Sequence, residues 1–366
     1  MDQIKPLTSL RFFAALWVVV FTYVHEVSLP FTSGFIDKGY LGVDLFFILS
    51  GFILSYVYLE AFGEGRFDYG KFIVHRLARI YPLHLATLGF TLLLILAAAI
   101  KGVTLDANVG NWAALPAHLT LTQAWGFAPT ASFNHASWSI SAEWLAYLSF
   151  PLVAMAAWPL RTRPVYALLL AIVLVVAIHM LFAAFVGFPL THATFQWGAL
   201  RIVPCFLFGS ALYLAWRAGA VRNRRIALFG TLLGMLIVFA AASASHGGNM
   251  IDTLIVIALG FTLLSVAGLN PDGVMGNRAL VYLGEISFAT YMIYVPWKWV
   301  YLKGAKALLH LDNEPLPLLW WLVGLAALVP LSALAHHLVE LPCRKLVRVW
   351  GERLVNKLNY KPVKIR

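Results

Sequence analysis

The sequence predicts an all-α, polytopic integral membrane protein with about ten transmembrane helices. Hydrophobic residues make up 61% of the 366 residues and charged residues only 12%, whereas about one quarter of a soluble domain is charged. The mean hydropathy is +0.80. Apolar stretches of the roughly 20 residues needed to cross the hydrocarbon recur from end to end. These observations exclude an ordinary water-soluble fold.

Ten apolar segments account for most of the chain. The first is expected to be an uncleaved helix, because the residues before it carry a single lysine and no small-residue cleavage site follows it. We assign residues 1–345 to one transmembrane domain and residues 346–366 to a basic cytoplasmic tail. The segments cover residues 8–27, 40–59, 82–100, 138–158, 165–187, 200–217, 226–244, 250–269, 282–302 and 317–339.

Basic residues outnumber acidic ones, and the formal net charge is +11. Such an excess is compatible with nucleic-acid binding until the positions of the charges are considered. Most of the 27 lysines and arginines fall in alternate loops and in the tail, so the positive-inside rule places both termini in the cytoplasm. The expected partner is therefore a lipid bilayer and not a nucleic acid.

Two connecting segments have a predicted structure of their own. Residues 67–81 are too polar to span a membrane, but their apolar side chains share one helical face, which predicts an amphipathic helix on the inner leaflet. Residues 101–137 form the longest outer loop and are expected to fold back over the outer mouth of the bundle. Cys205 and Cys343 lack the spacing of a disulfide or a metal site, so no metal is expected.

Ionisable residues inside the apolar segments are candidates for function, because each costs at least about 2.5 kcal/mol to insert. Snorkelling near a helix end is the simpler explanation for Glu26, Lys298 and His336. Asp44 and Glu340 are expected to cap or pair structurally. The full set comprises Arg11, His25, Glu26, Asp44, Glu143, His179, Arg201, Glu285, Lys298, His336, His337 and Glu340.

Six short motifs occur in order along the apolar segments. They are LRFFAAL at 10–16, GVDLFFILSGFI at 42–53, RLARIYP at 76–82, SWSISAE at 137–143, LGEISFATY at 283–291 and ELPCR at 340–344. Each motif is weak alone. Together they resemble the acyltransferase-3 family of membrane-bound O-acyltransferases, and the resemblance spans nearly the whole chain.

The resemblance implies both an activity and its substrates. Members of this family typically move an acetyl or other short acyl group from cytoplasmic acyl-CoA to an acceptor on the far side of the membrane. Their acceptors include O-antigen, exopolysaccharide, peptidoglycan, Nod factors and macrolides. The expected co-substrate is therefore acyl-CoA, with acetyl-CoA first, and the expected acceptor is a glycan, a lipid-linked saccharide or a glycosylated small molecule.

The sequence departs from the family pattern at two positions. The first helix of the family usually carries a histidine eleven residues after the arginine, and Thr22 occupies that position here. His25 follows three residues later and shares a helical face with it. The ninth helix commonly has a histidine three residues after the tyrosine, but Tyr291 is followed by Tyr294.

Acyl transfer to a hydroxyl requires a base, a cation or donor set for the thioester oxyanion, and a dry cavity. His25 is the predicted base, Glu143 a carboxylate that orients it or acts instead, and Arg11 the predicted cation. The simpler alternatives are an interfacial histidine at His25 and an arginine at Arg11 that only anchors its helix.

The resemblance also suggests binding residues for the donor. Arg76 and Arg79, together with Tyr81 of the same motif, are predicted to contact acyl-CoA, because guanidinium groups suit phosphate. Membrane orientation alone would also place arginines at these positions.

Candidate acceptor contacts come from three segments. Ser137, Ser139, Tyr291 and Tyr294 are predicted to bind the acceptor, although helix N-capping is a commoner use of such serines. Arg201 is expected to pair with Glu143, to hold an acceptor, or only to snorkel.

Two other functions use the same buried polar residues. A transporter or flippase would need them to pass a substrate, although the chain has no internal repeat of the kind that many transporters carry. A catalytically degenerate member of the family would act as a binding subunit, and Thr22 and Tyr294 motivate that alternative.

Overall fold

The computed structural model describes residues 3–28, 33–102, 108–128, 130–244, 248–311 and 314–359. Within these ranges the chain is helical, with one isolated bridge between Val27 and Leu316. Ten of the described helices are long and apolar enough to cross a membrane, by length and composition. This confirms the predicted fold class. The orientation of the termini stays a prediction.

The ten long helices follow the predicted apolar segments closely. Their bounds are α1 (Lys5–Tyr23), α3 (Gly42–Gly63), α4 (Tyr69–Ile100), α6 (Ser137–Leu160), α7 (Pro164–Val186), α8 (Gly198–Arg217), α9 (Arg224–Ala244), α10 (Asn249–Ala267), α11 (Arg278–Leu308) and α12 (Leu318–Ala335). Through the turn η7 (His336–Glu340), α12 continues into α13 (Leu341–Asn359). The predicted domain boundary at residue 345 falls inside α13 and stays a prediction.

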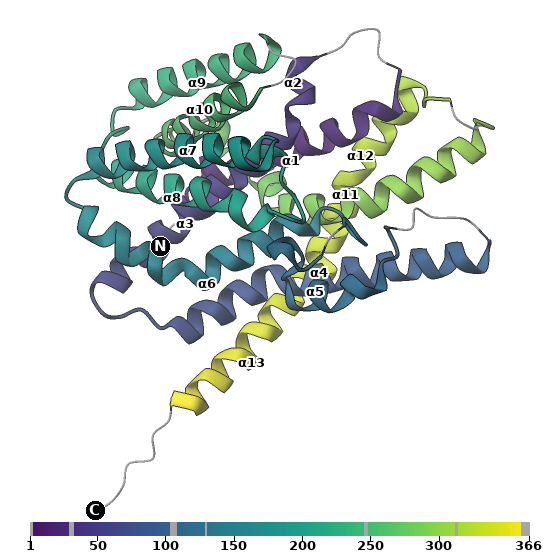
Figure 1. Ribbon diagram of the computed structural model, residues 1–366, viewed down its shortest axis with the longest axis horizontal. Coiled ribbons are helices and arrows are strands. Elements are labelled where there is room, and N and C mark those ends of the chain that lie inside the picture. The colour runs from purple at the N-terminus through teal and green to yellow at the C-terminus, as the bar shows by residue number, and fades with distance from the viewer. Residues whose placement is uncertain are drawn as a thin grey trace, which may run out of the picture.

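A tightly packed centre holds the helices together. In Figure 1, α3 and α8 lie in the middle of the bundle, with α9 at one edge. The α3–α8 crossing depends on two glycines, since a methyl group at Gly51 would lie 2.0 Å from the carbonyl oxygen of Phe206, and one at Gly209 would lie 1.9 Å from that of Ile48. Small residues allow this close approach where lipid gives no hydrophobic drive to association.

Residues 67–81 do not form a separate surface helix, so that expectation is wrong. They join the following apolar segment in α4, which continues through Pro82. The side chain of Asp68 caps this helix by accepting a hydrogen bond of 3.0 Å from the backbone N–H of Lys71. A proline within a membrane helix is tolerated where neighbouring groups satisfy the freed backbone, and the polar first half is covered by α13 through a His75–Glu352 contact of 2.6 Å.

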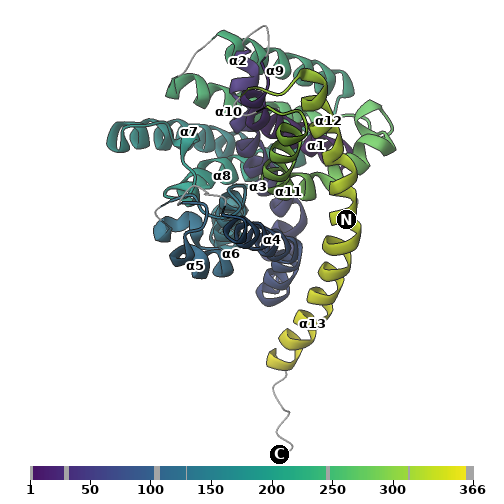
Figure 2. The same cartoon turned by 90° about the vertical axis from the view of Figure 1, so that its right-hand side faces the viewer.

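The long connection after α4 folds back onto that helix. It contains α5 (Leu115–Thr120), and the Tyr81 hydroxyl donates a hydrogen bond of 2.9 Å to the carbonyl of Leu119. Nε2 of His84 lies 2.8 Å from the carbonyl oxygen of His118. Residues 103–107 and 129 of this connection lie outside the described residues. Both views show α13 projecting away from the bundle (Figures 1 and 2).

Candidate active site

A cavity of about 150 Å³, the first cavity, lies where five helices meet. Its charged lining comes from α1, α4 and α6, and Ser50 of α3 and Tyr291 of α11 complete the wall. The charged residues are Arg11, Arg76, Arg79 and Glu143. Helices that are far apart in the sequence therefore bring the predicted cation, carboxylate and donor-binding arginines to one place.

Glu143 is held in the first cavity through one of its two oxygens. Its Oε1 accepts hydrogen bonds from the Ser50 hydroxyl at 2.9 Å and from the Tyr147 hydroxyl at 2.5 Å. Tyr147 lies one helical turn further along α6, so the two side chains share a face. Oε2 has no hydrogen-bond partner among the described residues, which leaves it available to a bound molecule.

The three arginines of the first cavity differ in how they are paired. Arg79 forms an ion pair with the buried carboxylate of Glu340. Arg76 donates to the Tyr58 hydroxyl at 3.3 Å, and its Nε is buried without a partner. Arg11 is half-buried and makes no ion pair or hydrogen bond within the part of the chain that the structure describes. With three guanidinium groups against two carboxylates, the cavity favours an anion.

A second cavity of about 570 Å³ adjoins the first. Val43 and Tyr291 line both and form the wall between them. The polar lining of the second cavity comes from the end of α1 and the turn η1 (Val24–Glu26) after it, from the turn η2 (Gly39–Leu41), from the segments before α6 and α8, and from α8 and α11. It includes Thr22, His25, Tyr40, His135, Thr191, His192, Thr194, Arg201, Tyr294 and Lys298.

Arg201 pairs with Asp44 rather than with Glu143. Its Nε donates to Oδ1 of Asp44 at 3.0 Å and its Nη2 donates to Oδ2 at 2.6 Å. Nη1 and Nη2 also donate one hydrogen bond each, to the carbonyls of Ala193 and Tyr40 respectively, both at 3.1 Å. Arg201 is 1% exposed and Asp44 is 0% exposed. The pair therefore links α8 to α3, as expected of Asp44.

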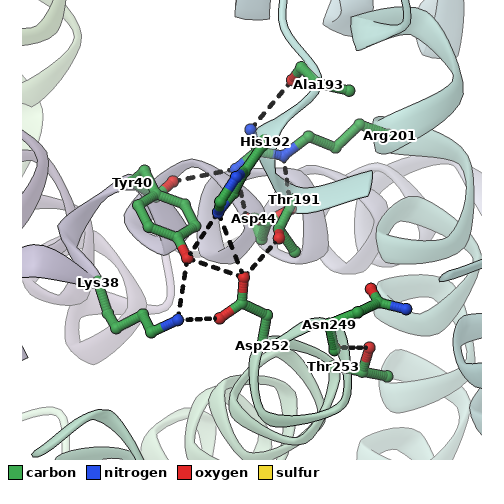
Figure 3. A network of polar contacts seen from close by, with 10 residues as sticks. All are labelled: Lys38, Tyr40, Asp44, Thr191, His192, Ala193, Arg201, Asn249, Asp252 and Thr253. Carbon is green, nitrogen blue, oxygen red and sulfur yellow. Dashed lines mark hydrogen bonds and ion pairs between the residues drawn. The ribbon is translucent and has the colours of Figure 1, made fainter. Parts of the chain in front are cut away.

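A second buried carboxylate, Asp252 of α10, organises the rim of the second cavity (Figure 3). It accepts hydrogen bonds from Lys38 at 2.6 Å, from the Tyr40 hydroxyl at 2.8 Å and from the Thr191 hydroxyl at 2.7 Å. His192 Nε2 lies 3.1 Å from the Tyr40 hydroxyl. Burial lowers the pKa of His192, so its imidazole is neutral at neutral pH.

The predicted site residues do not gather at one point. Arg11 and His25 stand at opposite ends of the first span, about 21 Å apart along a helix axis, and no hydrogen bond joins His25 to Glu143 among the described residues. The first cavity is lined by Arg11, Arg76, Arg79, Ser139, Glu143 and Tyr291, and the second by His25, Arg201, Tyr291 and Tyr294.

Two predicted residues line neither cavity. The Tyr81 hydroxyl bonds to the connection after α4, as described above. Ser137 is fully buried, and its Oγ accepts a hydrogen bond of 3.2 Å from Nε2 of Gln123. Both side chains fix the connection that precedes α6. Their predicted roles with acyl-CoA and with the acceptor stay predictions without support from a cavity contact.

The two departures from the family pattern meet in one place. Thr22 of α1 and Tyr294 of α11 both line the second cavity, beside His25. The rings of Tyr291 and Tyr294 have centroids 5.7 Å apart. The positions at which the sequence lacks the expected histidines therefore belong to the second cavity alone.

Among the histidines that line the cavities, His135 and His192 are the two that the sequence did not suggest. Both lie in loops, outside the apolar segments in which ionisable groups were sought. His135 comes two residues before the SWSISAE motif, and this proximity is the one signal that pointed to it. Burial lowers the pKa of His135 as well. The sequence of the loop before α8 gives no signal for His192. Its significance appears only when folding brings Asp252 close to it.

The sequence of this multi-pass protein matches a known family over most of its length. A family model described as an acyltransferase domain matches residues 5–337. The chain therefore belongs to the acyltransferase-3 family of membrane-bound O-acyltransferases, which confirms the resemblance inferred from the six motifs.

Several curated proteins are similar over nearly the whole chain. "Acyltransferase MdmB" of Streptomyces mycarofaciens is 27% identical over 94% of this chain and 92% of its own length. "Putative peptidoglycan O-acetyltransferase YrhL" of Bacillus subtilis (strain 168) is 22% identical over 93% of this chain, which spans 55% of that protein. "Putative O-acetyltransferase SACOL0978" of Staphylococcus aureus (strain COL) is 20% identical, and the chain spans 58% of it. No solved structure matches the chain.

Proposed function

We propose that this protein transfers an acetyl or other short acyl group from cytoplasmic acyl-CoA to a hydroxyl of a carbohydrate or similar acceptor. The observation that carries the proposal is the pair of adjoining cavities, one cationic and one not, that share a wall at Val43 and Tyr291. Two substrates that enter from opposite faces of a bilayer would meet at this wall. A multi-pass protein of the bacterial inner membrane would satisfy that arrangement.

The donor is assigned to the first cavity. Arg76 and Arg79 suit the phosphates of acyl-CoA, since a guanidinium group binds phosphate through two parallel hydrogen bonds. Arg11 has no partner in the described chain and is the proposed cation for the thioester oxygen as negative charge develops there. The positive-inside rule supports a cytoplasmic entrance on this side. Relatives named as O-acetyltransferases favour acetyl-CoA.

The acceptor is assigned to the second cavity. The acceptor oxygen attacks the thioester carbonyl while a base takes its proton, and the carbon–sulfur bond breaks to release CoA as the thiol. His25 is the proposed base, and Glu143 is the alternative on the donor side of the wall. Direct transfer and a covalent acyl-enzyme both fit this arrangement.

The activity is tested with purified protein in lipid nanodiscs. Radiolabelled acetyl-CoA and a panel of glycosides should give labelled O-acetyl product with the wild type and much less with His25→Ala or Glu143→Gln. If both variants keep the full rate, the proposed mechanism is wrong. If vesicles move a substrate without forming product, the protein is a flippase or transporter, and loss of acyl-CoA binding would indicate a degenerate binding subunit.

A further inference from the structure

The second cavity has charged walls but offers no free charge. Of the described residues that line it, only Arg201 and Lys298 carry a formal charge. Arg201 uses four N–H bonds on Asp44 and two backbone carbonyls, as described above. A buried guanidinium that is satisfied in this way has little left to offer a ligand, because withdrawing it would strand the Asp44 carboxylate in the interior.

Lys298, the other cation of the lining, is neutralised by Glu26. Its Nζ lies 3.1 Å from a carboxylate oxygen of Glu26 and donates a hydrogen bond of 2.8 Å to the carbonyl of Thr22. Lys306 also approaches Glu26, at 3.8 Å. This second lining cation is therefore also held by a carboxylate of the protein.

A third ion pair, Lys38–Asp252, lies next to Tyr40 and Thr191 in the wall of the second cavity. Lys38 is 5% exposed and contacts Asp252 at 2.6 Å, and Asp252 is 0% exposed. Figure 3 shows both buried pairs, Lys38–Asp252 and Arg201–Asp44. Tyr40 contacts both, since its hydroxyl donates to Asp252 and its carbonyl accepts from Arg201. Lys38, Arg201 and Lys298 are thus each paired with a carboxylate of the protein, and Lys306, which does not line the cavity, shares Glu26 with Lys298.

The remaining polar groups of the wall suit hydroxyl groups. The Tyr40 hydroxyl donates its hydrogen bond to Asp252. The Tyr40 oxygen must therefore accept in its contact with His192, which requires an N–H at Nε2 of that imidazole. Nδ1 of His192 is then an acceptor that a ligand hydroxyl can satisfy and an anion cannot. The hydroxyl of Thr194 and the rings of Tyr294 and Trp299 line the same space.

We propose that the second cavity selects an uncharged, hydroxyl-bearing acceptor, such as a neutral glycoside, and rejects anionic sugars. The proposal rests on the proposed function, since it describes the acceptor of that reaction. A carboxylate or phosphate that entered would lose its hydration without gaining an unpaired cation, which is strongly unfavourable. A neutral sugar loses only hydroxyl hydration, which the imidazole, hydroxyl and aromatic groups of the wall replace.

The experiment compares matched glycosides that differ in one charge. Methyl β-D-glucopyranosiduronate and its neutral, nearly isosteric C6 amide, and the corresponding galactoside pair, are offered with radiolabelled acetyl-CoA at pH 8. Binding of the same glycosides is measured by isothermal titration calorimetry, so selection is read even where turnover is slow. We expect each neutral compound to exceed its uronate at least tenfold in kcat/KM and in affinity. Equal use or equal binding of the two overturns the proposal, whereas binding of the neutral sugar without transfer overturns only the proposed function.

A variant tests whether ion pairing causes the selection. Glu26→Gln removes the carboxylate that neutralises Lys298, so the neutral-to-uronate ratio should fall severalfold, mainly through a lower KM for the uronate. Glu60→Gln is the matched control, because Glu60 pairs with Arg217 at 2.7 Å and lines neither cavity. Thermal unfolding monitors the fold of both variants. An unchanged ratio in Glu26→Gln, or the same change in Glu60→Gln, would contradict the proposal.

Discussion

The two cavities meet at one wall and treat charge in opposite ways. In the first, Arg11 is left without a partner in the described chain, and three arginines face two carboxylates. In the second, both lining cations are matched by carboxylates of the protein itself. An unpaired buried cation is costly to fold and is useful only where a ligand supplies the anion. The difference therefore supports the proposal that the first cavity binds a charged donor and the second an uncharged acceptor.

The same division appears in the motifs. Arg11, Arg76, Arg79, Glu143 and Tyr291, which follow the family pattern, line the first cavity. The two departures from that pattern, Thr22 and Tyr294, line the second. The motif residues that match the family pattern and the two that depart from it therefore line different cavities, which supports the proposal that donor and acceptor occupy separate sites.

The largest effect is expected from breaking a matched pair. Asp44→Ala leaves the guanidinium of Arg201 buried and unpaired, which should cost about 3–5 kcal/mol in the free energy of unfolding. The loss is measured as the thermal stability of the detergent-purified protein. The double variant Asp44→Ala/Arg201→Met removes both charges and should recover much of the stability. If Asp44→Ala alone is as stable as the wild type, the pair does not hold α3 to α8.

The unmatched arginine should behave in the opposite way. Arg11→Ala removes no ion pair, so stability should change little, whereas kcat for acyl transfer should fall about 10²–10³-fold, the loss typical of one oxyanion donor. Initial rates with radiolabelled acetyl-CoA measure the change. Arg11→Lys, which keeps the charge but not the fork of donors, is the matched control and should lose less. A variant that unfolds instead would make Arg11 a structural residue.

A smaller effect is expected within the first cavity at Glu143. Tyr147→Phe deletes one of the two hydroxyls that bind Oε1, and hydrogen bonds to a charged group contribute about 1.5–3 kcal/mol. We expect kcat to fall by about tenfold or more. The neutral-to-uronate ratio should stay unchanged, because Tyr147 lines the first cavity, the proposed donor site. A change in acceptor selectivity would show that the two cavities are not separate. The measurement is the kinetics of both members of a glycoside pair.

The fold was predictable because hydropathy is a property of each segment alone, and the ten described spans follow the predicted ones. Arg11 and Glu143 could be found because a charge inside an apolar segment is conspicuous. His192 could not, since its significance depends on Asp252, which packing brings from α10 to the loop before α8. Arg11 and His25, the predicted cation and base, line different cavities because residues fourteen apart on one helix are separated by about 21 Å along the axis.

The smallest effect, and the one that bears most directly on the second cavity, is a rescue. Thr22 precedes His25 by three residues, so an imidazole at position 22 would lie about 4.5 Å nearer to the shared wall. If His25 supplies the base that the family usually places there, His25→Ala should lose activity, and Thr22→His in that background should recover about tenfold, a part of the 10²–10⁴ typical of general base catalysis. Thr22→Gln in the same background is the control, because it adds a polar group of similar length that does not act as a base.

The rescued variant should lose activity below the pKa of its new imidazole, and a rate that does not follow pH would show that position 22 serves binding and not proton transfer. Recovery by glutamine as well as histidine would assign the base to another group of this wall, with His192 the best-supported histidine there, because only its ring is held by the Tyr40–Asp252 network.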